Sequence, residues 1–461
     1  MSQSSTSIRE QPRFWTQGNY APVFEELTVD HLEVEGAIPA ALDGVYVRNG
    51  ANPKHSPGDH WFLGHGMLHG VSLRGGRALW YRNRFVRTPL LHRGPAAPPA
   101  PPTLTDNASN VALVQHAGRL LSLGEVGLPY ELAPEDLSTV GVYDFGGKLG
   151  TSMTAHPKLD PDTGEMLFFG YSFAPPHLTF HVADARGMLV RSQPIDLPGP
   201  AMMHDFAVTK RHVVFLDLPI VFNLELALAG DALPFRWNDG YGARLGVMAR
   251  SGEGGVRWFE IDPCFVFHVM NAYENPFEPD RIVLDVARYG KLWHEDNTRF
   301  DALPQLVRYR IDLRDERVSA KPLADHPLEF PQIDPRRSGK PYRFGYALGL
   351  RASNGDAPGG VSALLKIDHA RGALHAHLLH PAQQADEVTF VPAGPRAAED
   401  EGYLLCYLYD QRTELSELVI LDAQAMEAPA LARIKLPQRV PFGFHGTWSA
   451  RESTSRAPRG C

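Results

Sequence analysis

Paired apolar segments that flank turn residues recur along the whole chain, and they constrain the fold more than any other feature. One pair, residues 70–73 and 78–81, flanks the turn sequence Arg-Gly-Gly-Arg, and the same pattern returns within 114–121, 180–190 and 364–379. A tight turn between two segments of strand length is typical of a β-hairpin, so we predict antiparallel strands. Strands do not alternate with helices of a dozen residues, which disfavours a parallel α/β sheet.

The proportion of turn-forming residues supports this prediction. The 461 residues include 42 glycines and 39 prolines, about 18% together against roughly 12% in average usage, which favours many turns over long helices. So many antiparallel strands in one chain predict an all-β fold that closes on itself, and seven blades of about 60 residues would form a β-propeller. We expect a single domain over residues 1–461, with its core at about 34–450 and flexible ends at 1–12 and 451–461.

Two segments interrupt the pattern of strands. Residues 88–105 contain six prolines, which cannot sit inside a sheet, and we expect a long crossing loop there. Residues 218–241 are apolar, with helical spacing over 224–229. Both segments are expected to cover one face of the sheets. The second either packs on that face or gives the protein a peripheral contact with a membrane, and the sequence leaves both readings open.

Charge and cysteine usage exclude several classes of partner. The 45 basic and 53 acidic side chains give a net charge of -8, the wrong sign for a nucleic-acid-binding protein. Cys264, Cys406 and Cys461 form no CxxC pair, which excludes a disulfide framework and a cysteine zinc site. No apolar run reaches the ~18 residues of a membrane span. We therefore expect a soluble cytoplasmic protein without an obligate protein partner.

Histidine is the residue type that best indicates chemistry in this chain. The motifs of zincins, P-loop proteins and serine hydrolases are absent, and the glycines within 64–70 have the wrong spacing for a dinucleotide-binding loop. Four of the 20 histidines lie in apolar, strand-like surroundings: His156, His204, His268 and His445. A buried imidazole must be hydrogen-bonded or metal-bound, because an unpaired one costs about 1–3 kcal/mol.

The spacing of these four histidines favours one shared site. Taken singly, each is better explained as a hydrogen-bonded core residue or a surface residue. As a set they are separated by 48, 64 and 177 residues, close to one, one and three blades of about 60 residues. Residues this far apart in sequence meet at the axis of a propeller, so the set predicts a metal site there.

Several longer motifs make the chain resemble a known family, the carotenoid cleavage oxygenases. Residues 44–53 read GVYVRNGANP, residues 125–132 read EVGLPYEL, and residues 203–206 read MHDF. Further motifs follow as HWF at 60–62, GMLH at 66–69, AHPK at 155–158, EFP at 329–331, GKPYR at 339–343 and FHG at 444–446. The resemblance covers most of the chain, and the motifs are specific to that family.

The resemblance implies a seven-bladed β-propeller with a dome of loops and helices over one face. It also implies one Fe(II) per chain on the axis, held by His156, His204, His268 and His445. Three glutamates at matching positions, Glu125, Glu329 and Glu387, would accept hydrogen bonds from these imidazoles and fix their tautomers. The implied activity is a dioxygenase that cleaves a C=C bond of a carotenoid or apocarotenoid to aldehydes or ketones. O2 is the co-substrate, and no flavin, haem or nicotinamide takes part.

The chain departs from the family pattern in three places. The residue before Asn110 often blocks the sixth iron position, and here it is Ser109, smaller than the usual threonine. Where many relatives read HWFDGDG, this chain reads HWFLGHG at 60–66, away from the iron ligands. Members that cleave phenolic stilbenes carry a lysine immediately before the first glutamate, and this chain has Gly124. An uncharged position there favours an apolar polyene as substrate, although a glycine can also simply open space.

Other functions remain open at this point. Within the same fold, the alternatives are cleavage of a stilbene or phenylpropanoid alkene and isomerisation of an alkene without incorporation of oxygen. A propeller that only binds carotenoids, without catalysis, is the alternative from a different class.

Overall fold

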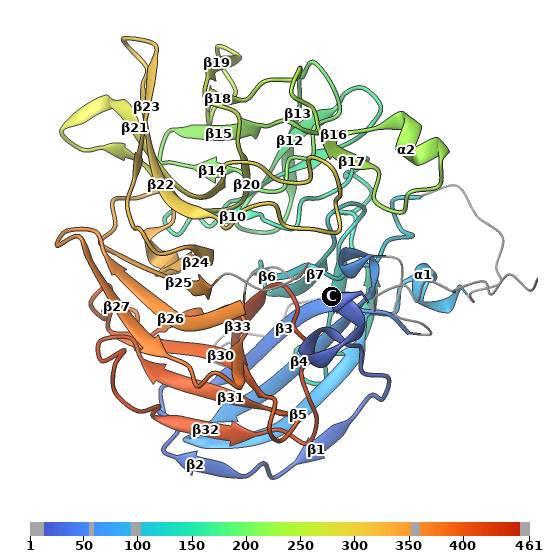
Figure 1. Cartoon of the computed structure of the whole chain (residues 1–461), viewed down its shortest axis with the longest axis vertical. Helices are drawn as coiled ribbons and strands as arrows, with labels where there is room; N and C mark the ends of the chain where they lie inside the picture. Colours follow the sequence, from blue (N-terminus) through green and yellow to red (C-terminus); the bar gives the residue numbers. More distant parts are fainter. Residues whose placement is uncertain (1–12, 55–59, 94–102, 352–359, 452–461) are drawn as a thin grey trace, which may run out of the picture.

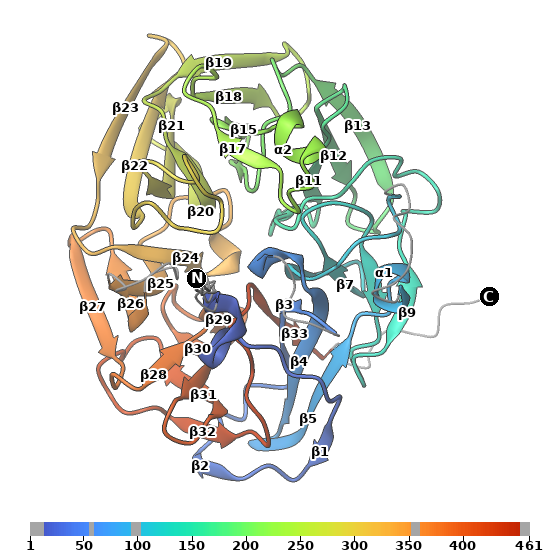
Figure 2. The same cartoon turned by 45° about the vertical axis from the view of Figure 1, so that its right-hand side comes forward.

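Seven β-sheets surround one axis in the computed structural model, which describes residues 13–54, 60–93, 103–351 and 360–451. Figure 2 shows the sheets in sequence order around this axis, from blue through green and yellow to red. The predicted all-β fold with seven blades is therefore confirmed. The ends at 1–12 and 452–461, for which we predicted flexibility, lie outside the described residues.

Four neighbouring sheets take nearly all of their strands from residues 28–260. Sheet 1 contains β1 (Thr28–Asp30), β5 (Arg77–Phe85), β4 (His65–Arg74), β3 (Gly44–Asn52) and β33 (Gly446–Ala450). Sheet 2 contains β6 (Ala112–His116), β7 (Arg119–Leu123), β8 (Tyr130–Leu132) and β9 (Thr139–Val142). Sheet 3 contains β10 (Lys158–Leu159), β11 (Met166–Tyr171), β12 (Leu178–Ala183) and β13 (Leu189–Ile195). Sheet 4 contains β14 (Ala207–Val208), β15 (His212–Asp217), β18 (Arg244–Ala249) and β19 (Val256–Glu260).

The remaining three sheets complete the ring. Sheet 5 contains β20 (Phe265–Asn275), β21 (Glu278–Tyr289), β22 (Gln305–Asp312) and β23 (Arg317–Pro322). Sheet 6 contains β24 (Leu328–Ile333), β25 (Phe344–Arg351), β26 (Gly360–Asp368) and β27 (Ala373–Leu378). Sheet 7 contains β2 (Val34–Gly36), β32 (Ala432–Lys435), β31 (Leu415–Asp422), β30 (Gly402–Asp410), β28 (Gln383–Ala385) and β29 (Thr389–Pro392).

Both ends of the chain take part in closing the ring. The C-terminal strand β33 pairs with β3, with Val45 opposite Ser449, in sheet 1. The N-terminal strand β2 pairs with β32, with Val34 opposite Ile434, in sheet 7. In Figures 1 and 2 the blue and red strands accordingly lie side by side. Two sheets that each combine early and late strands close the propeller and protect its strand edges.

The apolar residues are arranged as packing between blades requires. Strands β11 and β12 are buried along their whole length, because neighbouring blades cover both faces of sheet 3. The outermost strand β13 instead alternates exposed residues, namely Val190, Ser192 and Pro194, with buried or partly buried ones, because only one of its faces packs on the sheet array. All four hairpins predicted from the sequence are confirmed, as β4–β5, β6–β7, β12–β13 and β26–β27.

Short helices and an extra strand pair lie outside the seven sheets. The 3-10 helices are η1 (Phe14–Thr16), η2 (Gly18–Tyr20), η3 (Trp61–Leu63) and η4 (Pro335–Arg337). The α-helices are α1 (Pro89–His92) and α2 (Leu224–Leu228), and α2 lies between β16 (Ile220–Phe222) and β17 (Phe235–Trp237). The segment 218–241 is thus an excursion from sheet 4, as predicted, while most of the predicted proline-rich loop, at 94–102, lies outside the described residues.

Two further sequence expectations can be compared with the described residues. No helix within these residues is long and apolar enough to cross a membrane. Cys264 and Cys406 are free and buried, and Cys461 lies outside the described residues.

Candidate metal centre

Four histidines from four different sheets meet at the axis. His156, His204 and His445 lie in the segments that lead into the innermost strands β10, β14 and β33, and His268 lies near the start of the innermost strand β20. One ring nitrogen of each lies within 4.8 Å of the corresponding nitrogen of every other. The Nε2 atoms of His156 and His204 are 2.9 Å apart, and those of His268 and His445 are 3.2 Å apart. The structure therefore brings together all four histidines singled out in the sequence.

The charge state of two of these imidazoles and the spacing within the set fit a bound metal ion. Burial lowers the pKa of both His156 and His268 well below the usual value, with a further lowering by the neighbouring histidines. Both rings are therefore neutral near pH 7, which is the form that binds a metal. Two imidazole nitrogens that each lie ~2.1 Å from one ion, at right angles, are separated by about 3 Å, close to both of the distances above. The residues present are those that a four-histidine metal site requires.

Three glutamates contact the outer nitrogens of three of these histidines. The Nδ1 atom of His268 lies 2.5 Å from Oε2 of Glu329. His445 Nδ1 lies 3.0 Å from Glu387 Oε1, and His204 Nδ1 lies 2.8 Å from Glu125 Oε2. An Nδ1–H that donates to a carboxylate leaves the Nε2 lone pair free and directed at the axis. Glu125, Glu329 and Glu387 thus occupy the positions expected from the resemblance.

Each glutamate is held in turn by a neighbour. The Tyr171 hydroxyl donates to Glu125 Oε1 over 2.9 Å, and Gln332 Nε2 donates to Glu387 Oε1 over 2.6 Å. The amide of Phe330 donates to Glu329. Phe330 has a φ of +54° and lies at a register shift between β24 and β25, so the backbone is strained beside this carboxylate. Burial raises the pKa of Glu329 to about 7.

The fourth histidine of the set, His156, is held through a threonine. The His156 amide donates to Thr154 Oγ1 over 3.2 Å, and the same hydroxyl donates to the carbonyl of His204 over 3.3 Å. At His204 burial lowers the pKa, but the carboxylates of Glu125, Asp205 and Glu329 together raise it by more, so that the pKa of His204 lies above the usual value. Glu125, which contacts Nδ1 of that ring, makes the largest of these contributions.

Two cavities meet at the four histidines, and one of them has many more polar lining residues than the other. One, of about 310 Å³, is lined by aromatic and aliphatic side chains from η2, η3, β20, β24 and the segments 232–235 and 442–444. The other, of about 540 Å³, runs along the innermost strands of all seven sheets and includes Lys158, Asp205, Asn271 and Gln332. His268 and His445 line both cavities. The metal site thus lies between an apolar cavity and a polar axial channel.

The structure also shows the surroundings of two other positions singled out in the sequence, Ser109 and Gly124. The Ser109 hydroxyl donates to Ser122 over 2.8 Å, and Ser109 is absent from the described lining of the apolar cavity. Val111 lines that cavity together with His204 and His445, so Val111, rather than Ser109, shares the cavity with these histidines. Sequence reasoning missed this residue because the direction of a side chain in an irregular segment depends on tertiary packing. Ser109 itself has a φ of +46°, which no local motif indicates.

Gly124 is enclosed rather than open to the cavity. A Cβ atom at this position would lie 3.2–3.3 Å from Val126 O, Asn107 Oδ1 and Ser109 N. Among the described residues that line the apolar cavity there is no lysine or arginine. The cavity therefore offers no cation to a phenolate.

Comparison with known proteins identifies the family. The family model for retinal pigment epithelial membrane protein matches residues 20–450. A carotenoid cleavage oxygenase of Mycobacterium tuberculosis is 38% identical over 97% of this chain and 99% of its own length. An apocarotenoid-15,15'-oxygenase of Synechocystis is 34% identical over 97% of this chain and 98% of its own length. The chain belongs to the carotenoid cleavage oxygenase family, as the sequence motifs predicted.

Solved structures agree with this assignment. A cobalt-substituted apocarotenoid oxygenase of Synechocystis superposes with a TM-score of 0.83 at 31% identity, over 95% of this chain and 98% of that one. A lignostilbene dioxygenase of Pseudomonas brassicacearum gives a TM-score of 0.86 at 29% identity, over the same shares of the two chains. The fold is therefore shared between relatives named for different substrates.

Proposed function

We propose that this protein is an Fe(II)-dependent dioxygenase that cleaves a C=C bond of a carotenoid or apocarotenoid to aldehyde or ketone products with O2. The observation that carries this proposal is the apolar cavity without a lysine or arginine in its described lining, three of whose lining residues belong to the set of four converging histidines. A long polyene is apolar over most of its length and fits such a lining. The named relatives of the chain support the same reaction class.

The histidines, glutamates and aromatic residues of the site would have different roles in this reaction. His156, His204, His268 and His445 would hold one Fe(II) per chain, which imidazole suits and which, when bound, supplies the activation of O2. The glutamates keep three of the imidazoles in the ligating tautomer. Aromatic rings of the cavity, among them Phe267, Phe330 and Phe444, exclude water and orient the polyene beside the histidines.

The proposal is tested by the substrate on which the iron-loaded protein acts. Carotenoids, apocarotenals and hydroxystilbenes are supplied separately in detergent, and the products are separated and identified by mass spectrometry. We expect polyene aldehydes from carotenoids or apocarotenals, whose lengths locate the cleaved bond. Benzaldehydes as the main products would instead assign the protein to the stilbene branch. A bound polyene that is neither cleaved nor isomerised by the iron-loaded protein would favour a binding protein.

We further propose that the excursion from sheet 4 contacts a lipid bilayer, from which an apolar substrate can enter. Leu224 and Leu228 of α2 are 63% and 79% exposed, and Phe173, 64% exposed, stacks on Phe222 of β16. Figure 2 shows α2 beside β17, and Phe235 of β17 lines the apolar cavity. Exposed apolar side chains next to the cavity thus favour a lipid surface as their partner.

Flotation with liposomes tests this contact. The double variant Leu224→Asp, Leu228→Asp is expected to lose most of its lipid association, because charged side chains do not enter the acyl region. Leu378→Asp is the matched control, since Leu378 is 77% exposed on β27, the outermost strand of sheet 6. Equal flotation of the double variant and the wild-type protein would contradict the proposal.

A further inference from the structure

Asp205 is a buried carboxylate directly after the ligand His204, and its partners lie beside two other ligands. It is 3% exposed and lines the polar axial channel. Its Oδ1 atom lies 2.6 Å from Nζ of Lys158, two residues after His156. Its Oδ2 atom accepts a hydrogen bond of 2.8 Å from the amide of Val269, the residue after His268. One side chain therefore links three segments that carry histidines of the site.

These links cross the boundaries between blades. Lys158 begins β10 of sheet 3, Asp205 precedes β14 of sheet 4, and Val269 lies in β20 of sheet 5. Without Asp205, the backbone amide of Val269 and the Lys158 ammonium would each lose a partner in the channel. Burial of a carboxylate costs free energy unless other groups satisfy its charge and its lone pairs. At Asp205 an ammonium and two backbone amides do so.

We propose that Asp205 is a positioning residue of the metal site, which with Lys158 holds the segments of His156, His204 and His268 at the spacing that one ion requires. Asp205 lies in the lining of the axial channel, whereas Glu125 contacts the outer nitrogen, Nδ1, of His204. Groups that orient metal ligands typically change metal affinity by about 10–100-fold when removed. The inference rests on the metal site proposed above.

The test compares metal retention in three variants of the full-length protein. Asp205→Asn removes the charge that holds Lys158, and Lys158→Met leaves the hydrogen bonds of Asp205 to Val269 and Phe206 in place. Asp217→Asn is the matched control. Asp217 is 0% exposed and pairs with Arg244 at 2.8 Å. The Asp217–Arg244 pair is about as buried as the Asp205–Lys158 pair, but it links β15 to β18 within sheet 4.

Three readouts separate positioning from general stability. They are Fe(II) bound per chain, the rate of Fe(II) release to an excess of chelator, and the visible absorption of the Co(II)-loaded protein, which reports the ligand geometry. We expect release to be about tenfold faster or more in Asp205→Asn and about threefold faster in Lys158→Met, with altered Co(II) absorption in both. Asp217→Asn is expected to release iron at the wild-type rate even if it unfolds at a lower temperature.

The outcomes are distinguishable. Release from Asp205→Asn at the wild-type rate would overturn the inference, and so would equal acceleration in Asp217→Asn, because that result indicates general loosening. If Asp205→Asn does not fold, Lys158→Met decides, and wild-type release from it would overturn the inference. A wild-type protein that takes up no metal would contradict the proposed function itself, and the inference with it.

Discussion

At the scale of single residues, a second buried ion pair supports His445. Arg48 Nε lies 3.1 Å from Asp386 Oδ2, and the two side chains are 1% and 3% exposed. Arg48 also donates to the carbonyl of Pro441. Asp386 precedes Glu387, and the segment that begins at Pro441 leads to His445, so this pair braces the glutamate and the histidine that contact each other.

We predict that Arg48→Met is strongly destabilising, because it leaves the Asp386 carboxylate buried without its cation. The expected loss is about 3–5 kcal/mol of unfolding free energy at pH 8. Burial raises the pKa of Asp386 to about 6, with Arg48 opposing the rise and Glu387 adding to it. A raised carboxyl pKa contributes stability that is present at low pH and is lost as the pH rises through about 6. The penalty of the variant is therefore expected to be smaller at pH 5 than at pH 8.

Urea denaturation followed by tryptophan fluorescence at both pH values measures this penalty. Arg433→Met serves as the control, because its pair with Glu417 is partly exposed at 30% and 27% and is expected to contribute about 0–1 kcal/mol. Similar losses for the two arginine variants would show that the Arg48–Asp386 pair has no special role.

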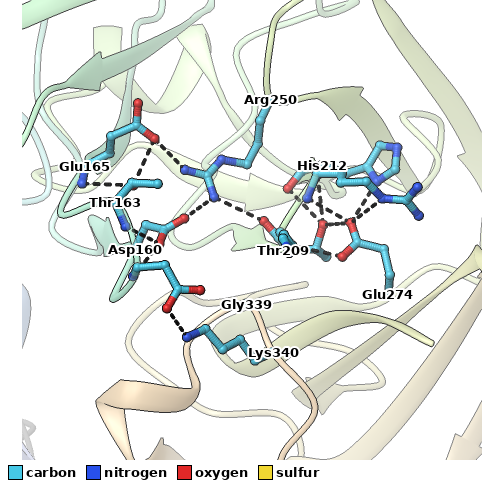
Figure 3. Close-up of polar contacts among 12 residues, drawn as sticks. Asp160, Thr163, Glu165, Thr209, His212, Arg250, Glu274, Gly339 and Lys340 are labelled. Atoms are coloured by element: carbon cyan, nitrogen blue, oxygen red, sulfur yellow. Dashed lines mark hydrogen bonds and ion pairs between the residues drawn. The ribbon is translucent and has the colours of Figure 1, made fainter. Parts of the chain in front are cut away.

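At the scale of elements, polar turns tie neighbouring sheets together on the face drawn in Figure 3. Glu274, in β20 of sheet 5, accepts hydrogen bonds from the turn between β14 and β15 of sheet 4, including His212 Nδ1 at 3.0 Å and Arg211 N at 3.0 Å. Arg250, after β18, pairs with Asp160 and, at 2.7 Å, with Glu165, both between β10 and β11 of sheet 3. These contacts fix the relative positions of sheets 3, 4 and 5, which carry three of the four histidines.

We predict that Glu274→Gln weakens this connection in a pH-dependent way. Burial raises the pKa of Glu274, but hydrogen bonds from His212, Thr209 and Arg211 N outweigh it and lower the pKa to about 2. A lowered carboxyl pKa contributes stability that is present above about 4.5 and is lost as the pH falls towards 2. The variant should therefore lose about 2–3 kcal/mol at pH 7 and much less at pH 3. Chemical denaturation at both pH values measures the difference, and a loss that is the same at both would contradict the role of the ionised carboxylate.

At the scale of the whole molecule, the sequence predicted the architecture because the signals involved are local or periodic. Turn residues between short apolar segments located the hairpins. The histidine separations of one, one and three blades match their places in sheets 3, 4, 5 and 1. The pairing of β2 with β32 and of β3 with β33 was not predicted, because partners about 400 residues apart leave no local signal.

The contacts around the site could not be predicted from the sequence either. Tyr171 and Gln332 lie on strands of other sheets, and only the assembled ring brings them to Glu125 and Glu387. The MHDF motif includes Asp205, but the contacts of Asp205 with Lys158 and Val269 cross two blade boundaries and could not be predicted from that motif. Spacing along the chain predicts which residues reach the axis, whereas the directions of side chains depend on tertiary packing.

The most direct test of the account is to follow oxygen from 18O2 into the cleaved substrate. The Fe(II)-loaded protein is given an apocarotenal under 18O2, and both carbonyl fragments are analysed by mass spectrometry before their oxygen exchanges with water. We predict label in both fragments, and no cleavage by His268→Ala, which lacks one of the four histidines. Fragments that carry oxygen from water alone, or no cleavage of any polyene by the iron-loaded wild-type protein, would contradict the account.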